Sequence, residues 1–183
     1  MHIRELQPSD IQKVKEFTDV GIGKNYFSLD EMKECFKKSS SEGVMCSFVL
    51  VNSDDHIKGL RLAYPPGSWS KGKGNKLRPD LWKTRIENVA YFQSLFLSDE
   101  AQGQGFGPRL SEAAILAFKK LGAQAVVTHA WKESPNNSSI KYLSRFGFEI
   151  VATHMNYWID VDYECSLDGK PCKCTAVEMI KYI

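Results

Sequence analysis

The chain contains no long hydrophobic run. Hydrophobic residues make up 43% of the 183 positions, but no apolar stretch approaches the roughly 20 residues that a membrane-spanning helix needs. The start of the chain, from His2 to Glu5, is charged and leads on without the apolar core of a secretory signal. We therefore expect a cytoplasmic protein that does not bind a membrane.

Strong charge of either sign is also missing. The formal net charge is only +2, whereas a dedicated nucleic-acid binder usually presents a strongly basic face. No nucleic-acid partner is therefore expected. The length suits one domain with a substantial core and is short for two.

Cysteine is scarce and odd in number. Five cysteines in a chain expected in a reducing compartment favour free thiols over a disulfide framework. Three of them, Cys165, Cys172 and Cys174, lie close together in the sequence. A structural zinc ion usually takes four ligands, and the spacing C-x6-C-x-C matches no standard zinc motif. Reduced thiols are the favoured interpretation and no metal site is predicted, with zinc at these cysteines as the alternative.

The dipeptide Asp168-Gly169 lies between the first and second of these cysteines and has the composition of a two-residue hairpin turn. Such a turn would place the first cysteine opposite the second, with the third on the same face as the second. A fourth zinc ligand would then have to come from His154, Asp162 or a more distant residue.

Hydrophobic periodicity predicts one α/β domain with the element order β-α-α-β-β-β-α-β-α-β-β. Capping-box patterns predict two early helices that begin at Ser9 and Ser28. The clearest helical stripe runs from Leu110 to Leu121. The last two strands, from Ile150 to Cys165 and from Cys172 to Ile180, are expected to form a hairpin.

A glycine-rich turn, Gln102 to Gly107, separates a predicted strand at Val89 to Leu97 from the helix with the clear stripe. The backbone N–H groups of such a turn and the positive end of the helix dipole form an anion site, so we expect a phosphate-bearing ligand. A Walker A loop needs Gly-Lys followed by Ser or Thr, whereas Pro108 and Arg109 follow here. A dinucleotide fingerprint fails too, because Pro108 stands where its third glycine should be.

The segment Leu95 to Ile115 resembles the acetyl-CoA-binding segment of the GNAT superfamily, which has the pattern Q/R-x-x-G-x-G/A at the start of a helix. Gln102, Gly105 and Gly107 match that pattern. The segment Asn136 to Phe148 resembles the later N-x-x-A-x-x-x-Y-x-x-x-G-F segment of the same superfamily. The two motifs together are far more specific than either alone.

The resemblance covers most of the chain and implies a single GNAT-like acetyltransferase domain over residues 1–183. Its α/β fold would have a mixed central β-sheet of about six to seven strands flanked by about four helices. Residues 65–85 would form a long loop insertion, and residues 150–183 a cysteine-containing C-terminal hairpin.

The resemblance also implies an N-acetyltransferase that moves the acetyl group of acetyl-CoA directly onto an amine. The acceptor would be a small-molecule or peptide amine, and a homodimer is compatible with the sequence. The alternative function is an acyl-CoA-binding module without transfer activity, which would serve as a sensor or partner platform.

By the same resemblance, several residues would bind acetyl-CoA. The backbone of Phe96 and Leu97 would pair with the pantetheine arm like an added strand, and a backbone N–H there would stabilise the oxyanion. Asn136 would contact the pantetheine, with the adjacent Asn137 as the alternative, and both also suit a turn and a helix N-cap. The backbone amides that would hold the pyrophosphate belong to Gln102, Gly103, Gln104, Gly105, Phe106 and Gly107.

The catalytic groups depart from the family pattern. Leu143 stands where the family usually has a tyrosine as general acid, and Tyr142 lies one position earlier, about 100° around the helix. Tyr142 is therefore either the acid or an ordinary packing residue. The general base is open among a carboxylate, a histidine and a water chain. The candidates are Glu87, Tyr91, His129 and Glu133.

The segment 65–85 shows no clear periodicity and is longer than most structureless loops, which are often functional at such lengths. We expect it to form part of the acceptor site, since Trp69 and Trp82 are unusual in a mere linker. Its basic residues would favour an acceptor with a carboxylate or phosphate. The alternative is a disordered, solvated loop. The basic residues are Lys71, Lys73, Lys76, Arg78, Lys83 and Arg85.

Overall fold

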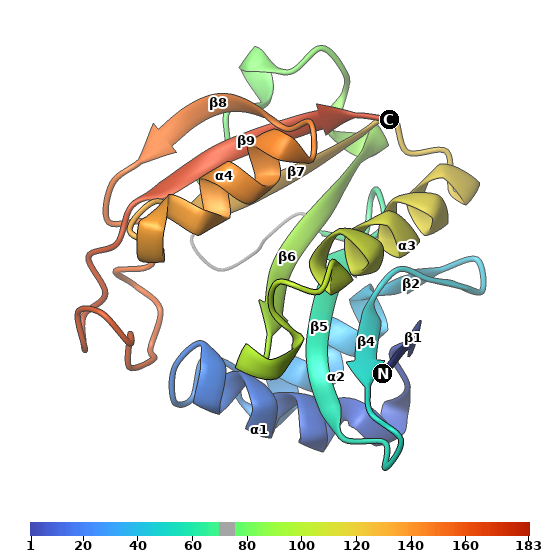
Figure 1. The fold of residues 1–183 in the computed structure, drawn as a ribbon. Helices are drawn as coiled ribbons and strands as arrows, with labels where there is room; N and C mark the ends of the chain where they lie inside the picture. Colours follow the sequence, from blue (N-terminus) through green and yellow to red (C-terminus); the bar gives the residue numbers. More distant parts are fainter. Residues whose placement is uncertain (70–75) are drawn as a thin grey trace.

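The computed structural model describes residues 1–69 and 76–183, and one mixed β-sheet forms its centre (Figure 1). The strands of this sheet are β1 (His2–Glu5), β4 (Phe48–Val51), β5 (Ile57–Tyr64), β6 (Val89–Leu97), β7 (Ala125–Trp131), β8 (Glu149–His154) and β9 (Ala176–Tyr182). Their order across the sheet is β1-β4-β5-β6-β7-β9-β8. Among these seven described strands, β6 and β7 pair in parallel and every other neighbouring pair is antiparallel.

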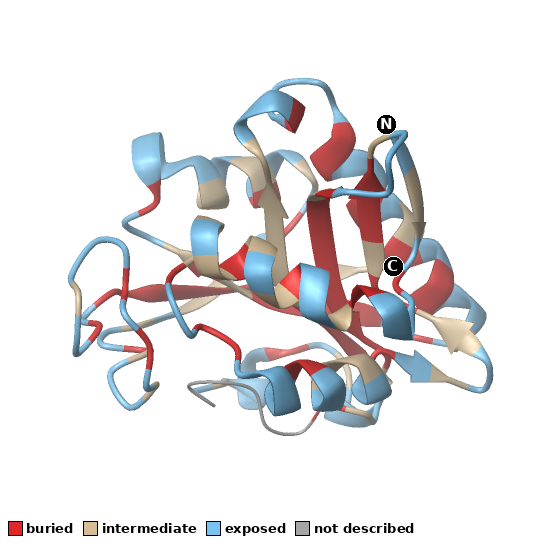
Figure 2. Cartoon of the chain, turned by 90° about the horizontal axis from the view of Figure 1, so that it is seen from below, coloured by how far each residue is buried: buried red, intermediate tan, exposed pale blue. Residues whose placement is uncertain are grey.

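Four α-helices in the described part of the chain cover the two faces of the sheet. They are α1 (Ile11–Gly21), α2 (Leu29–Lys38), α3 (Phe106–Lys120) and α4 (Ser138–Arg145). Helices α1 and α2 lie on one face, and α3 and α4 lie on the other (Figure 1). The central strands are buried between the two layers, whereas the outward faces of the helices are exposed (Figure 2). The expected α/β architecture is confirmed. None of the described helices combines the length and the apolar character needed to cross a bilayer.

The starts of the first two helices show one confirmed and one wrong prediction. Ser28 caps α2 as expected, because its hydroxyl accepts from the Glu31 N–H at 3.1 Å and the Glu31 carboxylate accepts from the Ser28 N–H at 2.8 Å. The predicted cap at Ser9 is wrong. A 3-10 turn precedes α1, and the buried Asp10 accepts from the Gln7 N–H at 2.9 Å while it pairs with Arg4 at 2.6 Å.

The last two strands pair antiparallel as expected, but β8 ends earlier and β9 begins later than the sequence predicts. Residues 155–175 form an irregular loop between β8 and β9, and a short ribbon, β2 (Ser40–Ser41) with β3 (Val44–Met45), lies apart from the main sheet. The expected two-residue turn at Asp168-Gly169 is wrong. Instead, the N–H and C=O of Cys165 both hydrogen-bond to Gly169 at 2.9 Å, so the turn closes one residue beyond Asp168.

The described parts of segment 65–85 are packed onto the α1–α2 face of the sheet. The indole N–H of Trp69 donates to the Val89 carbonyl at 2.6 Å, and that of Trp82 donates to the Glu178 carboxylate at 2.8 Å. Both tryptophans are buried. A solvated loop is therefore the wrong description of these parts, while Lys71 and Lys73 lie outside the described residues.

Candidate functional site

Strands β6 and β7 separate halfway along their length. Their parallel pairing runs from Val89–Ala125 to Phe92–Thr128 and stops there, although both strands continue. The Thr128 hydroxyl donates to the Phe92 carbonyl at 2.9 Å, at the last paired position. The strands then diverge, as Figure 1 shows. The second half of β6 thus presents a backbone edge toward an opening in the sheet.

A bulge in β6 lies where this opening begins. Ala63 of β5 pairs with Phe92, whereas Leu62 pairs with Ser94, so that Gln93 is an extra residue in the strand. Bulges re-aim side chains and are common next to functional sites. From Ser94 onward β6 still pairs with β5 on its other side. The predicted cofactor contacts Phe96 and Leu97 both lie in this diverging half.

The glycine turn follows β6 directly and leads into α3. Gly103 has φ +73° and Gly105 has φ +78°, a backbone region that glycine adopts without strain. The Gln102 side chain donates to the Leu97 carbonyl at 3.2 Å, which fastens the turn to the end of the strand. The first N–H groups of a helix have no partner within the helix, so those of Phe106 and Gly107 are available to an anion.

Asn136 and Asn137 both adopt the left-handed conformation, with φ of 54° and 55°. Asparagine tolerates this region better than most residues. Asn137 is at the N-cap position of α4, but its side chain makes no capping hydrogen bond. The Ser134 hydroxyl instead accepts from the Ser139 N–H at 3.0 Å. The side-chain part of the predicted N-cap role is therefore wrong, and both exposed asparagines have side chains available for a ligand.

Tyr142 faces the first turn of α3, whereas Leu143 does not. Leu143 is buried in the core between α4 and the sheet. The Tyr142 hydroxyl lies 2.7 Å from the Ser111 hydroxyl and donates to the Gly107 carbonyl at 3.2 Å. A Cβ atom at Gly107 would lie within 4 Å of the side chains of Tyr142 and Leu95. The one-residue offset thus brings Tyr142, not residue 143, to the glycine turn.

Arg61 is a buried cation beside Tyr142. Its guanidinium donates to the Ser111 hydroxyl at 2.8 and 3.2 Å and lies 4.1 Å from the centre of the Phe92 ring. No carboxylate pairs with it among the described residues. Burial lowers the pKa of Arg61 to about 10, while Tyr142 acts in the opposite direction. A buried cation without a carboxylate partner favours a negative charge that develops nearby.

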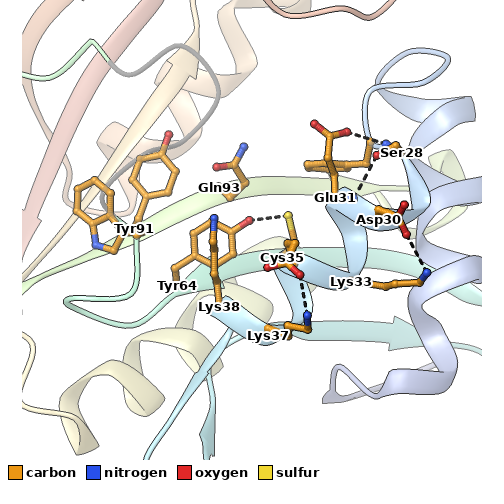
Figure 3. Close-up of a pocket in the computed structure, with 13 residues that line it drawn as sticks. Ser28, Asp30, Glu31, Lys33, Cys35, Lys37, Lys38, Tyr64, Tyr91 and Gln93 are labelled. Atoms are coloured by element: carbon orange, nitrogen blue, oxygen red, sulfur yellow. Dashed lines mark hydrogen bonds and ion pairs between the residues drawn. The ribbon is translucent and has the colours of Figure 1, made fainter.

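A cavity of about 610 Å³ opens on the other face of the sheet, between α2 and β6 (Figure 3). Tyr91 and Gln93 line it from β6, and Trp69 lines it from the segment after β5. The ring of Trp69 stacks on Tyr91 at 4.8 Å between centroids. The charged part of the lining is balanced between acids and bases and includes Asp30, Glu31, Lys33, Glu34, Lys37 and Lys38.

His129 connects to this cavity through Tyr91. Its Nδ1 lies 2.9 Å from the Tyr91 hydroxyl and 3.1 Å from the Tyr157 hydroxyl, and its Nε2 lies 2.8 Å from the Lys76 carbonyl. Because a carbonyl only accepts, Nε2 carries the proton and Nδ1 accepts from a tyrosine. Burial lowers the pKa of His129 to about 4 and raises that of Tyr91 well above its usual value. Both groups are therefore neutral near pH 7.

The buried carboxylate of Glu178 holds the neighbouring loop in place. Glu178 accepts from the backbone N–H of Arg78 at 3.0 Å, from the Trp82 indole at 2.8 Å and from His154 Nε2 at 2.8 Å. The side chain of Glu178 is fully buried. These donors satisfy it, as a buried charge requires. Its place in an apolar strand pattern gave no sign of this role in the sequence.

Two of the other base candidates lie elsewhere. Glu87 is exposed just before β6, at the end of the strand opposite to the glycine turn, and pairs with Arg85 at 3.3 Å. Glu133 accepts from the Thr175 N–H at 3.0 Å and so anchors the loop before β9.

The described basic residues of segment 65–85 do not line the cavity. Arg78 pairs with Asp80 at 2.7 Å, and Lys76 donates to the Met155 carbonyl at 3.4 Å. The lining from this segment is Trp69. The expected preference for an anionic acceptor therefore has no support from the described basic residues.

The sequence profile of the Acetyltransferase (GNAT) family matches residues 17–148, which is more than half of the chain. The chain belongs to the GNAT family of acetyltransferases. A sequence comparison with curated proteins finds no match.

Solved GNAT structures share the whole fold at low sequence identity. A phosphinothricin acetyltransferase from Sinorhizobium meliloti in complex with AcCoA has a TM-score of 0.70 and 17% identity, over 100% of this chain and 88% of that one. Chaetomium thermophilum Naa20 in complex with a bisubstrate analogue gives 0.68 and 17%, over 100% and 87%. The ribosomal-protein-S18-alanine N-acetyltransferase from Escherichia coli gives 0.65 and 16%, over 100% and 93%.

Two features of this GNAT chain carried no signal in the sequence. The separation of β6 from β7 depends on strand pairing between distant segments. Arg61 is one of two basic residues in β5, with Lys58, and its burial follows from the packing of α3 over β5. A charged residue inside a buried strand is the only local hint of such a role.

Proposed function

We propose that this GNAT chain is an N-acetyltransferase that moves the acetyl group of acetyl-CoA directly to the amine of a small molecule or peptide. The observation that carries the proposal is the position of β6. One side of the sheet has the glycine turn and Tyr142 at this strand, and the other has the cavity with Tyr91 and Gln93. An acyl donor and an amine could thus meet at the bulge from opposite faces.

The cofactor roles given by family resemblance fit this geometry. The unpaired edge of β6, including Phe96 and Leu97, would pair with the extended pantetheine arm. The amides of the turn from Gln102 to Gly107 would hold the pyrophosphate. The next residue, Pro108, has no N–H and cannot add a contact. Asn136, or its neighbour Asn137, would contact the pantetheine.

The transfer step uses groups on both faces. The amine nitrogen would attack the thioester carbonyl, and a β6 backbone N–H would stabilise the oxyanion. When the C–S bond breaks, the thiolate would take a proton from Tyr142. Arg61, through Ser111, lies where it would stabilise the negative charge that remains on the phenol oxygen.

The attacking amine must also lose a proton. Tyr91 and His129 offer a path from the cavity, since the Tyr91 hydroxyl lies 2.9 Å from Nδ1. A histidine with a pKa near 4 holds a proton poorly. We therefore assign to this pair a relay role that passes the proton to solvent, and we keep the exposed Glu87 out of the mechanism.

The cavity suits an amine without selecting an acid. Trp69, Tyr91 and Phe27 present aromatic faces, which attract ammonium groups. The similar structures include enzymes named for phosphinothricin and for an alanine of ribosomal protein S18. Both acceptor types therefore belong in the test.

The test is an acceptor screen that follows thiol release from acetyl-CoA. The panel would contain phosphinothricin, free amino acids, polyamines and peptides with an unblocked N-terminal alanine. A melting curve is recorded in parallel, because acetyl-CoA at 100 times its dissociation constant should stabilise the fold by about 2.7 kcal/mol. An acceptor-dependent release supports the proposal. Stabilisation without thiol release for any amine would instead favour a binding module. If acetyl-CoA gives neither stabilisation nor thiol release, both functions are overturned.

A further inference from the structure

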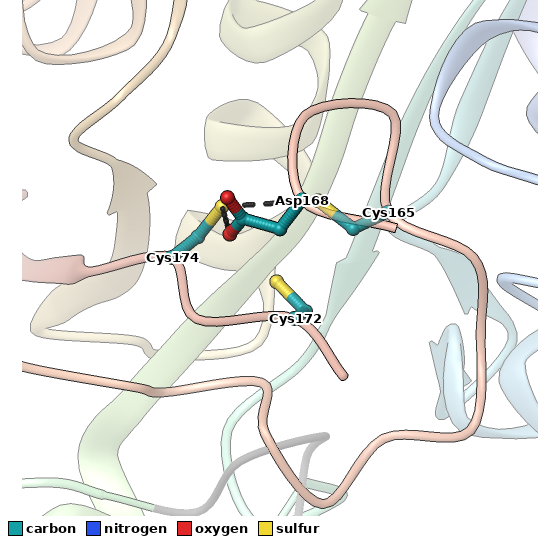
Figure 4. Close-up of side chains that lie close together, drawn as sticks. All are labelled: Cys165, Asp168, Cys172 and Cys174. Atoms are coloured by element: carbon teal, nitrogen blue, oxygen red, sulfur yellow. Dashed lines mark hydrogen bonds between the residues drawn. The ribbon is translucent and has the colours of Figure 1, made fainter. Parts of the chain in front are cut away.

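Three thiols and a carboxylate meet in the loop between β8 and β9 (Figure 4). One ligand atom each from Cys165, Asp168, Cys172 and Cys174 lies within 4.8 Å of all the others. The Cys165 and Cys174 sulfurs are 3.8 Å apart, and the Cys174 sulfur is 3.3 Å from Asp168 Oδ2. The three cysteines are buried, while Asp168 lies at the rim.

These distances match a tetrahedral zinc site. Two sulfurs bound at about 2.3 Å around a tetrahedral ion are about 3.8 Å apart, and a sulfur and an oxygen ligand are about 3.5 Å apart. A disulfide would instead need about 2.05 Å between sulfurs. The observed 3.8 and 3.3 Å are close to the separations of ligands around a shared ion.

The local backbone brings the ligands together. Cys165 and Gly169 exchange two backbone hydrogen bonds of 2.9 Å, and Gly169 has φ +71°, so the chain turns back and places Asp168 beside Cys165. The Lys173 N–H donates to Asp168 Oδ2 at 3.0 Å, which fixes the carboxylate next to the thiols of Cys172 and Cys174. With Asp168 included, the spacing becomes C-x2-D-x3-C-x-C. Its first half has the spacing of a zinc pair with aspartate in the second place.

The loop has almost no regular secondary structure to hold its shape. Residues 155–175 contain no described helix or strand apart from the single bridge at Cys165. Ordered loops of this length are uncommon. An ion pair joins Asp162 and Lys170, but both side chains are exposed, and such pairs contribute little. Small irregular regions are commonly stabilised by a metal or by disulfides.

We propose that Cys165, Asp168, Cys172 and Cys174 bind one structural zinc ion. Each residue supplies one ligand atom, so that the site has no open position for a substrate. The three thiols lose their protons to solvent as the Zn–S bonds form, and no oxidation or reduction takes place.

The zinc ion would stabilise one border of the cavity. The Tyr163 ring, beside the cluster, packs edge-on against Tyr26 at 5.1 Å between centroids. The Glu164 N–H donates to the Lys24 carbonyl at 3.3 Å. These contacts join the loop to the segment between α1 and α2, and Phe27 of that segment lines the cavity.

A second group of side chains of the metal-binding types is the alternative position for the zinc ion. His129, His154 and Glu178 also approach within 4.8 Å of one another. Their ring nitrogens and carboxylate already have protein partners, including the Lys76 carbonyl and the Trp82 indole. They form a satisfied hydrogen-bond network, so the cysteine cluster is the site that we assign.

The experiment is a metal analysis of the full chain, purified under reducing conditions from zinc-supplemented cells. We expect about one zinc ion per chain. Replacement by Co²⁺ should give the charge-transfer absorption of thiolate ligands in a tetrahedral site. Removal of zinc by a strong chelator should lower the melting temperature, and added Zn²⁺ should restore it.

Variants locate the ion. Cys174→Ser should reduce zinc affinity by roughly tenfold or more, and Asp168→Cys should keep the ion and increase the thiolate absorption of the cobalt form. Cys35→Ser and His154→Gln are the matched controls and should keep the full zinc content.

Two results would overturn the proposal. One is a reduced chain that holds neither Zn²⁺ nor Co²⁺ after reconstitution. The other is an ion that is lost in His154→Gln but kept in Cys174→Ser. If Cys174→Ser does not fold, the cobalt spectrum and the chelator experiment on the unmodified chain decide the question. None of these measurements depends on the proposed transferase activity.

Discussion

The Tyr91 hydroxyl lies 2.9 Å from Nδ1 of His129, and this contact links the cavity on the α2 face to a half-buried, neutral imidazole. A neutral imidazole in the folded chain has a direct consequence for stability at mildly acid pH. It also limits the part that His129 could take in proton transfer.

Stability should fall as the pH decreases from about 6.5 to about 4. Burial lowers the pKa of His129 from 6.5 to about 4, so above pH 6.5 it is neutral in both folded and unfolded chains. Below that pH the unfolded chain takes up a proton that the folded chain does not, and the free energy of unfolding decreases by up to about 3 kcal/mol. Denaturant unfolding at a series of pH values measures this. In His129→Gln the free energy of unfolding should depend less on pH than in the control His56→Gln. Equal pH dependence in the two variants would contradict the assignment.

Gly105→Val should abolish acetyl-CoA binding while costing little stability. The residue has φ +78°, and no atom lies within 4 Å of an added Cβ, so the fold tolerates the volume but the phosphate approach is blocked. Backbone strain should cost about 1 kcal/mol. Gly43→Val is the matched control, because Gly43 has φ +77° and equally open surroundings far along the chain. Calorimetric titration should show binding only in the control, and similar affinities would remove the turn from the pyrophosphate site.

Tyr142→Phe should lower kcat and leave the affinity for acetyl-CoA nearly unchanged. A general acid contributes roughly 100-fold or more, and phenylalanine keeps the ring packing while removing the hydroxyl. Ser111→Ala, which removes the hydrogen bond between Ser111 and Tyr142 but keeps the phenol, should have a smaller effect on kcat. Steady-state kinetics at several pH values would distinguish the roles. If Tyr142→Phe changes only the melting temperature, the tyrosine is a packing residue.

Trp69→Ala and Trp82→Ala should separate the acceptor site from the rest of segment 65–85. Both tryptophans are buried, and each truncation should cost about 3 kcal/mol of stability. Of these two tryptophans, Trp69 lines the cavity and Trp82 does not. We therefore expect a raised acceptor Michaelis constant in Trp69→Ala alone, with acetyl-CoA binding intact in both. Equal kinetic effects in the two variants would mean that the segment acts only through stability.

The sequence predicted those parts of the site that depend on local backbone chemistry. The glycine turn before α3 and the capping box at Ser28 follow from residues a few positions apart, and both are present. The role of Tyr142 was left open between general acid and packing residue, because one position along a helix rotates a side chain by about 100°, and it stays a prediction.

The missed features depend on contacts between distant segments. Two of the three donors to Glu178, Arg78 and Trp82, lie 100 and 96 positions earlier in the chain, which no periodicity reveals. The hairpin turn at Asp168-Gly169 was wrong for the opposite reason. The dipeptide was interpreted as the turn of a long β-hairpin. Instead, the Asp168 carboxylate accepts from the Lys173 N–H and closes a compact turn within a loop.

The gap between β6 and β7 also bears on the order of events in a catalytic cycle. Because the proposed acetyl-CoA site and the cavity lie on opposite faces of the sheet, neither ligand would block the path of the other. Either substrate could enter first, and either product could leave first. Initial rates measured against both substrates should therefore give intersecting lines in double-reciprocal plots. Parallel lines would indicate a covalent acyl-enzyme intermediate and are not expected from this arrangement.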